Sequence, residues 1–220
     1  MIKHFFLAAV AIFCTVASAN AQVLFDEITG AEGSGDPNAP TSLGTLSAGA
    51  FTVSGSSAVG PLGTAAGTLT DTTRDLFGFT IASGFQLDSI EVTALEQTLN
   101  NAAPTPFLDP GFYFLDAGTT TVIPSATTSA SLLTGQQFGI ATTPIGTNLL
   151  DTASVGNITA GPGVTAPLAA GDFVLGFQQT GPETISYSVQ LNVSSVPEPS
   201  SAALLSMAAL GLAGFRRRRS

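Results

Sequence analysis

The most constraining feature of this 220-residue chain is a strict alternation of apolar and polar residues near its C-terminus. The apolar members of residues 185–193 are Ile185, Tyr187, Val189, Leu191 and Val193, and Ser, Gln or Asn stands between each pair. Successive side chains of a β-strand point to opposite faces, so this pattern predicts a strand with one face in a core and the other in water. No helical period precedes the C-terminal tail, so the pattern favours an all-β fold.

Further short segments rich in Thr, Val, Ile and Phe predict more strands, separated by Gly, Pro and Asp clusters. Residues 173–179 are expected to form an antiparallel hairpin with 185–193. Residues 76–81 and 89–95 are expected to form a second pair around a bend at 82–84, with Ile90, Val92 and Ala94 on one face of the latter. Shorter strands are expected at residues 51–54, 111–115, 119–123, 138–141 and 155–159. Many short strands of this kind predict an antiparallel β-sandwich.

Three passages have the composition of loops. Residues 22–46 form a start rich in Gly, Pro and Asn, and residues 142–148 and 159–168 are rich in Thr, Gly and Pro. The remainder of residues 22–196 is long enough for one domain with a substantial core.

Residues 1–21 have the composition of a secretory signal peptide. Lys3 precedes an apolar run at residues 5–16, and Ala19 and Ala21 each end a small-x-small cleavage site. The apolar run is short for a membrane span. The sequence therefore predicts an N-terminal signal helix, cleavage after Ala19 or Ala21, and export.

Residues 22–196 lack several of the side chains that catalysis commonly uses. The chain's Lys3, His4 and Cys14 all lie in the predicted signal peptide, which leaves Arg74 as the basic residue of this region against fourteen acids. Nucleic-acid binding requires a basic surface. A Ser-His-Asp triad, a catalytic lysine, an ordinary zinc site and a disulfide are also excluded. The composition predicts a domain that is not an enzyme and needs no cofactor.

The acidic residues leave two alternatives open. Asp36, Asp71 and Asp75 are expected in loops, where their oxygens could gather around Ca²⁺, which takes six to eight ligands. The other interpretation is a solvated acidic rim in which Arg74 pairs with Asp71 or Asp75. A glycosidase using two carboxyl groups is a further hypothesis, although no pair stands out.

The C-terminal tail combines three elements in order. Pro197, Glu198 and Pro199 precede an apolar run at residues 202–215, and four arginines, Arg216, Arg217, Arg218 and Arg219, follow. A transmembrane helix over about residues 201–215 is expected, with the arginines holding the C-terminus in the cytoplasm and the domain outside. The run of about 14 residues spans about 21 Å, short for a ~30 Å hydrocarbon core. A plain membrane anchor would not require two prolines directly outside the span, where they hold the backbone extended.

This tail resembles the PEP-CTERM sorting signal of bacterial surface and exopolysaccharide-associated proteins. The resemblance implies that an exosortase recognises Pro197, Glu198 and Pro199 after export through the inner membrane, cleaves nearby, and leaves the protein in the cell envelope or outside the cell. A non-enzymatic surface or matrix protein is the resulting prediction. A carbohydrate- or calcium-binding module of an exopolysaccharide matrix is the alternative.

A second resemblance concerns residues 71–87 and 167–187. The segment Asp-Leu-Phe-Gly-Phe-Thr-Ile at 75–81, followed by Gly84 and Leu87, is similar to a recurrent segment of secreted jelly-roll domains akin to bacterial pre-peptidase C-terminal domains. Leu76 replaces the usual aromatic residue. The similarity covers about half of the exported domain, and it implies a jelly-roll-like sandwich without catalytic activity.

Overall fold

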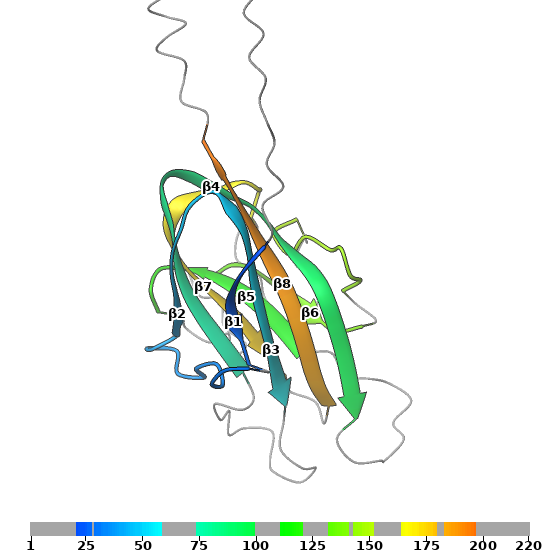
Figure 1. Ribbon diagram of the computed structural model, residues 1–220. Coiled ribbons are helices and arrows are strands. Elements are labelled where there is room, and N and C mark those ends of the chain that lie inside the picture. The colour runs from blue at the N-terminus through cyan, green and yellow to red at the C-terminus, as the bar shows by residue number, and fades with distance from the viewer. Residues whose placement is uncertain are drawn as a thin grey trace, which may run out of the picture.

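The structure is a computed structural model that describes residues 21–27, 29–58, 74–99, 111–120, 132–140, 143–151, 164–179 and 183–196 (Figure 1). Its described residues form eight strands and no helix, which confirms the all-β prediction. The strands are β1 (Gln22–Asp26), β2 (Thr41–Leu46), β3 (Gly49–Ala58), β4 (Arg74–Leu99), β5 (Gly111–Ala117), β6 (Leu132–Phe138), β7 (Leu168–Gln178) and β8 (Glu183–Ser195). The predicted signal peptide and transmembrane helix lie outside the described residues, apart from Ala21.

The strands are hydrogen-bonded in the order β1-β3-β8-β4-β7-β5-β6, and β2 also pairs with β4. Five of the pairings are antiparallel, but β1 with β3 and β2 with β4 are parallel. The expectation of a purely antiparallel sandwich was therefore wrong for these two pairs. Both involve strands from the first part of the domain, whose Gly- and Pro-rich composition predicted loops.

All eight strands belong to one hydrogen-bonded sheet that folds over within β4, so that it forms two layers. One layer holds β1, β3, β8 and the second part of β4, and the other holds β2, the first part of β4, β7, β5 and β6. Strand β4 is 26 residues long and bends near Gly84, whose φ of +82° is costly for residues with a Cβ atom. The part before the bend pairs with β2 and β7, and the part after it pairs with β8 throughout and with β7 at Gln86 and Leu87. Figure 1 shows β4 arching over the top of the molecule, so that its two halves run down different sides. The bend was predicted, but its two arms do not form a pair.

The expected hairpin of residues 173–179 with 185–193 is also absent. Strand β7 pairs with β4 and β5, whereas β8 lies between β3 and β4. Alternation along each segment fixes which face is buried but carries no information about the neighbouring strand. The chain therefore crosses from one layer to the other between β7 and β8.

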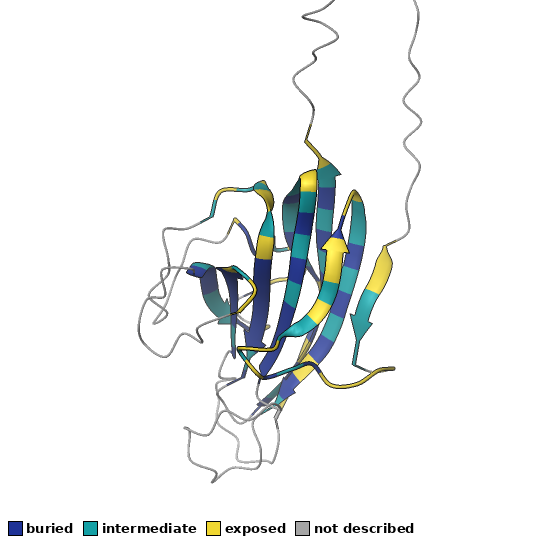
Figure 2. Cartoon of the chain, turned by 90° about the vertical axis from the view of Figure 1, so that its left-hand side faces the viewer, coloured by how far each residue is buried: buried dark blue, intermediate teal, exposed yellow. Residues whose placement is uncertain are grey.

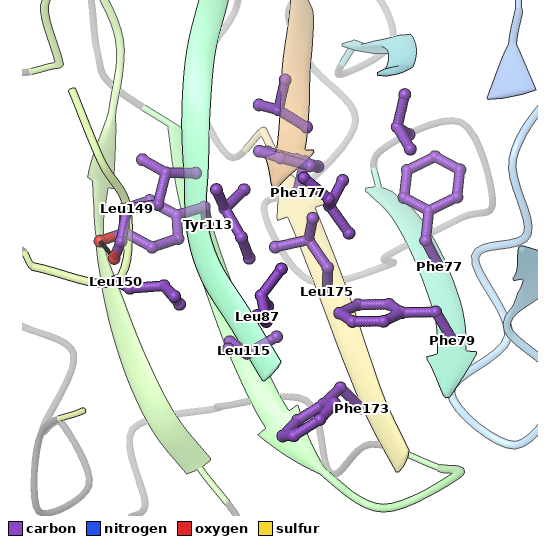
Figure 3. Packing of buried hydrophobic residues seen from close by; sticks show 14 of the residues in the cluster. Phe77, Phe79, Leu87, Tyr113, Leu115, Leu149, Leu150, Phe173, Leu175 and Phe177 are labelled. Carbon is purple, nitrogen blue, oxygen red and sulfur yellow. Dashed lines mark hydrogen bonds between the residues drawn. The ribbon is translucent and has the colours of Figure 1, made fainter. Parts of the chain in front are cut away.

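The core lies between the layers and is built from the predicted inward faces. In β8 all five alternating apolar residues are buried, and so are Phe173, Leu175 and Phe177 of β7. Figure 2 shows this alternation as dark and pale bands along the strands. Figure 3 shows Phe77 and Phe79 of β4 gathered with Leu175 and Phe177 of β7 in this core. Aromatic contacts link several strands, including Phe138–Phe177 at 5.1 Å between ring centroids.

A β-bulge between Val92 and Ala94 changes which residues of β4 point into the core. Ile90 and Val92 are buried as predicted, but Ala94 is exposed and Leu95 is buried in its place. The extra residue in the bulge shifts the alternation by one position. The prediction that Ala94 shares the inner face with Ile90 and Val92 was wrong for this reason.

Several boundaries also differ from the predictions. Residues 22–46 contain β1 and β2, so this start is not wholly loop. The strand expected at 138–141 instead ends at Phe138, and the described residues of the strand expected at 119–123 are not extended. The strand expected at 155–159 lies outside the described residues. Residues 51–54 and 111–115 lie within β3 and β5, as predicted.

Candidate functional site

The sorting-motif residues Pro197, Glu198 and Pro199 and the arginines 216–219 lie outside the described residues, but the structure describes the chain up to the residue before them. Ser195 is still paired with Phe85 of β4. The backbone N–H of Val196 then donates a hydrogen bond to the carbonyl of Gly84, at 2.8 Å. The folded domain therefore continues to the residue immediately before Pro197.

The beginning of β1 and the end of β8 lie at the same edge of the domain. Gln22 of β1 is in register with Phe51 of β3, which in turn is in register with Leu191 of β8. The first residue of β1 is thus level with a residue only four positions before the end of β8. The predicted signal-peptide junction and the tail consequently leave from one end of the domain.

The three calcium candidates are not brought together within the described residues. Asp36 lies in an exposed turn, where its Oδ1 accepts a hydrogen bond from the N–H of Asn38 at 2.9 Å. Asp71 lies outside the described residues. Asp75 was expected in a loop, but it is the second residue of β4 and is 3% exposed. The described part of the chain holds no group of three or more acidic, His or Cys residues arranged to hold a metal ion.

Asp75 instead forms a buried cluster with Glu27 and Tyr187. The hydroxyl of Tyr187 donates to Oδ2 of Asp75 at 2.7 Å, and the Glu27 carboxyl lies near enough for its negative charge to act on Asp75. The Tyr187 ring also stacks on Phe177, with centroids 4.0 Å apart. Asp75 of β4 and Tyr187 of β8 are therefore buried together, and the half-buried Glu27 at the end of β1 lies between them and the surface.

Glu27 is fixed by the backbone on both sides. Its Oε1 accepts the N–H of Gly33 at 2.8 Å, and its Oε2 accepts the N–H of Ser56 in β3. Glu27 follows β1 directly, and its carboxylate bonds β3 at Ser56, two residues beyond Ser54, where the β1–β3 pairing ends. These two amide donors hold the Glu27 carboxyl in a fixed orientation beside Asp75.

Burial is the largest cause that raises the pKa of Asp75, and the negative charge of Glu27 is the next. Together they raise this pKa from 3.8 to about 8. Burial and the nearby Asp75 also raise the pKa of Tyr187 well above its usual value. Asp75 is thus predominantly protonated at neutral pH.

The geometry of this pair differs from that of a glycosidase. Two catalytic carboxyl groups flank the scissile bond of a substrate in an open cleft. Asp75 is instead 3% exposed and accepts a hydrogen bond from the buried Tyr187, so it does not face a substrate. The cluster is suited to hold the end of β1 against β4 and β8.

Sequence reasoning missed Glu27 and gave Tyr187 only a packing role. Tyr113 and Tyr187 are both buried, as expected of sandwich aromatics. One signal for the burial of Asp75 was present in the sequence. Residues 75, 77 and 79 are two positions apart, so in a strand Asp75 faces the same way as the inward-facing Phe77 and Phe79. Arg74 has the opposite parity, and its Nε donates to the carbonyl of Gly35 at 2.5 Å.

The described residues contain no helix that is long and apolar enough to cross a membrane. The profile of the PEP-CTERM protein-sorting motif matches residues 195–220. No curated protein and no solved structure matches the chain.

These observations define the chain as an all-β domain that carries a C-terminal sorting signal. It is a PEP-CTERM protein, as its tail predicted. The motif implies export, a membrane-anchored sorting stage and an exosortase as processing partner. The resemblance of the domain to pre-peptidase C-terminal domains stays a prediction.

Proposed function

We propose that this protein is a non-enzymatic component of the cell surface or extracellular matrix, placed there through exosortase processing of its tail. The observation that carries the proposal is the sorting motif, which begins at the last residue of β8. Residues 22–196 contain no His, Lys or Cys, which supports a role without catalysis. Asp75 and Glu27 are both held by hydrogen bonds from within the domain, and this structural role agrees with a protein that is not an enzyme.

The proposed topology follows from charge and from the placement of the chain ends. Arg216–Arg219 stay in the cytoplasm, residues 201–215 cross the inner membrane, and the domain lies outside. The start of β1 and the end of β8 lie at the same edge, so both leave the domain on the side that faces the membrane. The short span suits temporary retention before release or attachment.

The processing site is expected after Val196. Processing enzymes require an accessible backbone, whereas Ser195 and Val196 are tied to Phe85 and Gly84 in the sheet. Cleavage before Val196 would require the end of β8 to unfold. Pro197 and Pro199 keep the following segment extended and lack backbone N–H groups.

The experiment is to express the full chain in its host and to determine the mature C-terminus by mass spectrometry. We expect a C-terminus after Val196 and before Ala202. A double variant, Pro197→Ala with Pro199→Ala, should leave the full-length chain in the membrane fraction. The control variant Ser194→Ala changes β8 outside the motif and should be processed normally. Retention of residues 202–220 on the wild-type protein would contradict the processing step.

Binding of carbohydrate is the second candidate function, because a hollow lined with hydroxyl groups lies on the outer face of the domain. Calcium binding remains a prediction, and the position of Asp75 does not favour it. A calcium titration that follows the melting temperature of the full chain tests it. A rise that is absent from Asp36→Asn would support a site at the exposed turn.

A further inference from the structure

The outer face of β3, β8 and the second part of β4 carries a hollow of about 350 Å³. Ligand pockets usually range from about 300 to 1,000 Å³, so this volume suits a small ligand or a short part of a polymer. The side chains that carry its polar groups are those of Ser54, Ser56, Ser186, Ser188, Glu27 and Glu96.

The hollow follows from the strand register. Ser54, Ser188 and Ala94 are aligned in one row across the three strands, and Ser56, Ser186 and Glu96 are aligned in the next. Outward-facing side chains of paired strands stand side by side on a sheet. Short side chains in both rows leave a depression, and the bulge in β4 is what turns Ala94 outward to form part of it.

The groups around the hollow are already held in place. The hydroxyl of Ser188 lies 3.0 Å from that of Ser54 and 3.1 Å from that of Thr93, so hydrogen bonds link all three strands. Glu27 is fixed by the N–H groups of Gly33 and Ser56. Serine, alanine and glycine have few rotamers to lose, so binding would cost little ordering entropy.

We propose that this hollow binds an uncharged, hydroxyl-rich saccharide unit. Hydroxyl groups of serine both donate and accept, and carboxylates accept from sugar hydroxyls. Ala94 and Gly55 provide apolar contact for the C–H groups of a sugar ring. This amphipathic combination matches a pyranose unit, which has polar edges and apolar faces.

The charge of the site selects against acidic sugars. Glu27 and Glu96 line the hollow, and no Lys or Arg does. Arg74, the basic residue of residues 22–196, is buried elsewhere at the start of β4. Like charges facing each other across an interface are unfavourable, so uronate polymers should be excluded.

The inference rests on the proposed extracellular placement for its biological setting, but it is measured independently of processing. Binding is followed by affinity electrophoresis of the full chain in mild detergent, in gels that contain an uncharged glucan, an uncharged galactomannan or alginate. The wild-type chain should be retarded by at least one uncharged polymer and not by alginate. Failure of tail cleavage in the host would leave this result unchanged.

Two matched pairs of variants locate the binding. Ala94→Ile fills the hollow and should abolish retardation, whereas Thr98→Ile, on the same strand but outside the hollow, should not. Glu96→Gln should weaken binding about tenfold through loss of a charge-assisted hydrogen bond. Glu91→Gln, which removes a charge from the same strand outside the hollow, should bind like wild type.

Circular dichroism and melting temperature show whether each variant is folded, and Glu96→Gln gives an answer even where Ala94→Ile fails to fold. The proposal is overturned by absence of retardation in both uncharged gels. It is also overturned by alginate binding of equal strength, or by Ala94→Ile binding as wild type does.

Discussion

The buried acid Asp75 makes the stability of the domain depend on pH in a direction opposite to that of most carboxyl groups. Its pKa is about 8 in the folded protein, against 3.8 for the exposed group of an unfolded chain. Between these values the folded state holds a proton that the unfolded state has released. Unfolding therefore releases a proton, and the free energy of unfolding falls as the pH rises. The variant Asp75→Asn should remove this dependence.

The expected size follows from the linkage relation. One proton released on unfolding changes the free energy of unfolding by about 1.4 kcal/mol per pH unit. Between pH 5 and pH 8 the free energy of unfolding of the wild type should therefore fall by about 4 kcal/mol relative to that of Asp75→Asn. This is a large fraction of the 5–15 kcal/mol that typically stabilises a domain. Asparagine fits the site chemically, since its oxygen can accept from Tyr187 and its amide can donate to Glu27.

The measurement is urea denaturation of the full chain at pH 5, 6, 7 and 8, with the difference between wild type and Asp75→Asn taken at each pH. The difference cancels the contributions of the other carboxyl groups. Asp88→Asn is the control, because it removes an acid from β4 outside the buried cluster and should follow the wild-type curve. If Asp75→Asn and wild type stay parallel across this range, Asp75 is not protonated in the folded state and the reasoning is refuted.

Two further substitutions test the packing around the core. Tyr187→Phe keeps the ring stack but removes the hydroxyl that donates to the buried carboxyl, so the free energy of unfolding at pH 6 should fall by about 1–3 kcal/mol. An unchanged urea midpoint would contradict that contact. Gly176→Ala should destabilise by about 1–3 kcal/mol, because its Cβ would overlap the ring of Phe114. Gly78→Ala meets only an ordinary contact in the same layer and should be neutral or slightly stabilising, so equal losses for both glycine variants would refute the packing argument.

The inward faces of the strands could be predicted from sequence because they depend on local alternation. The inward residues of β8 and β7 and the Phe77–Phe79 face of β4 follow the expected parity. Alternation fails where the backbone adds a residue, as in the bulge before Ala94, and where both faces are buried, as at Phe114 and Val174. A bulge leaves no reliable mark in a single sequence, since it depends on the partner strand.

The neighbours of each strand could not be predicted in this way. Residues 173–179 and 185–193 are neighbouring segments in the sequence and suited to a hairpin, but β8 pairs with β3 and β4. Strand partners are selected by long-range packing, which a local pattern does not encode. The buried cluster was missed for the same reason, because Glu27, Asp75 and Tyr187 are far apart in the sequence and meet only when β1, β4 and β8 are in place.

The position of β8 connects the fold to the sorting of the protein. The tail continues directly from a strand that is paired with β3 on one side as far as Val193 and with β4 on the other side as far as Ser195. A strand held from both sides frays less readily than one at an edge, because its opening breaks two sets of hydrogen bonds and exposes the core. Under the proposed function, the processing enzyme would meet a fixed boundary at Val196, and the two prolines that follow in the sequence favour an extended backbone. A folded domain of this kind can be released without loss of any strand residue, so its surface remains the same before and after processing.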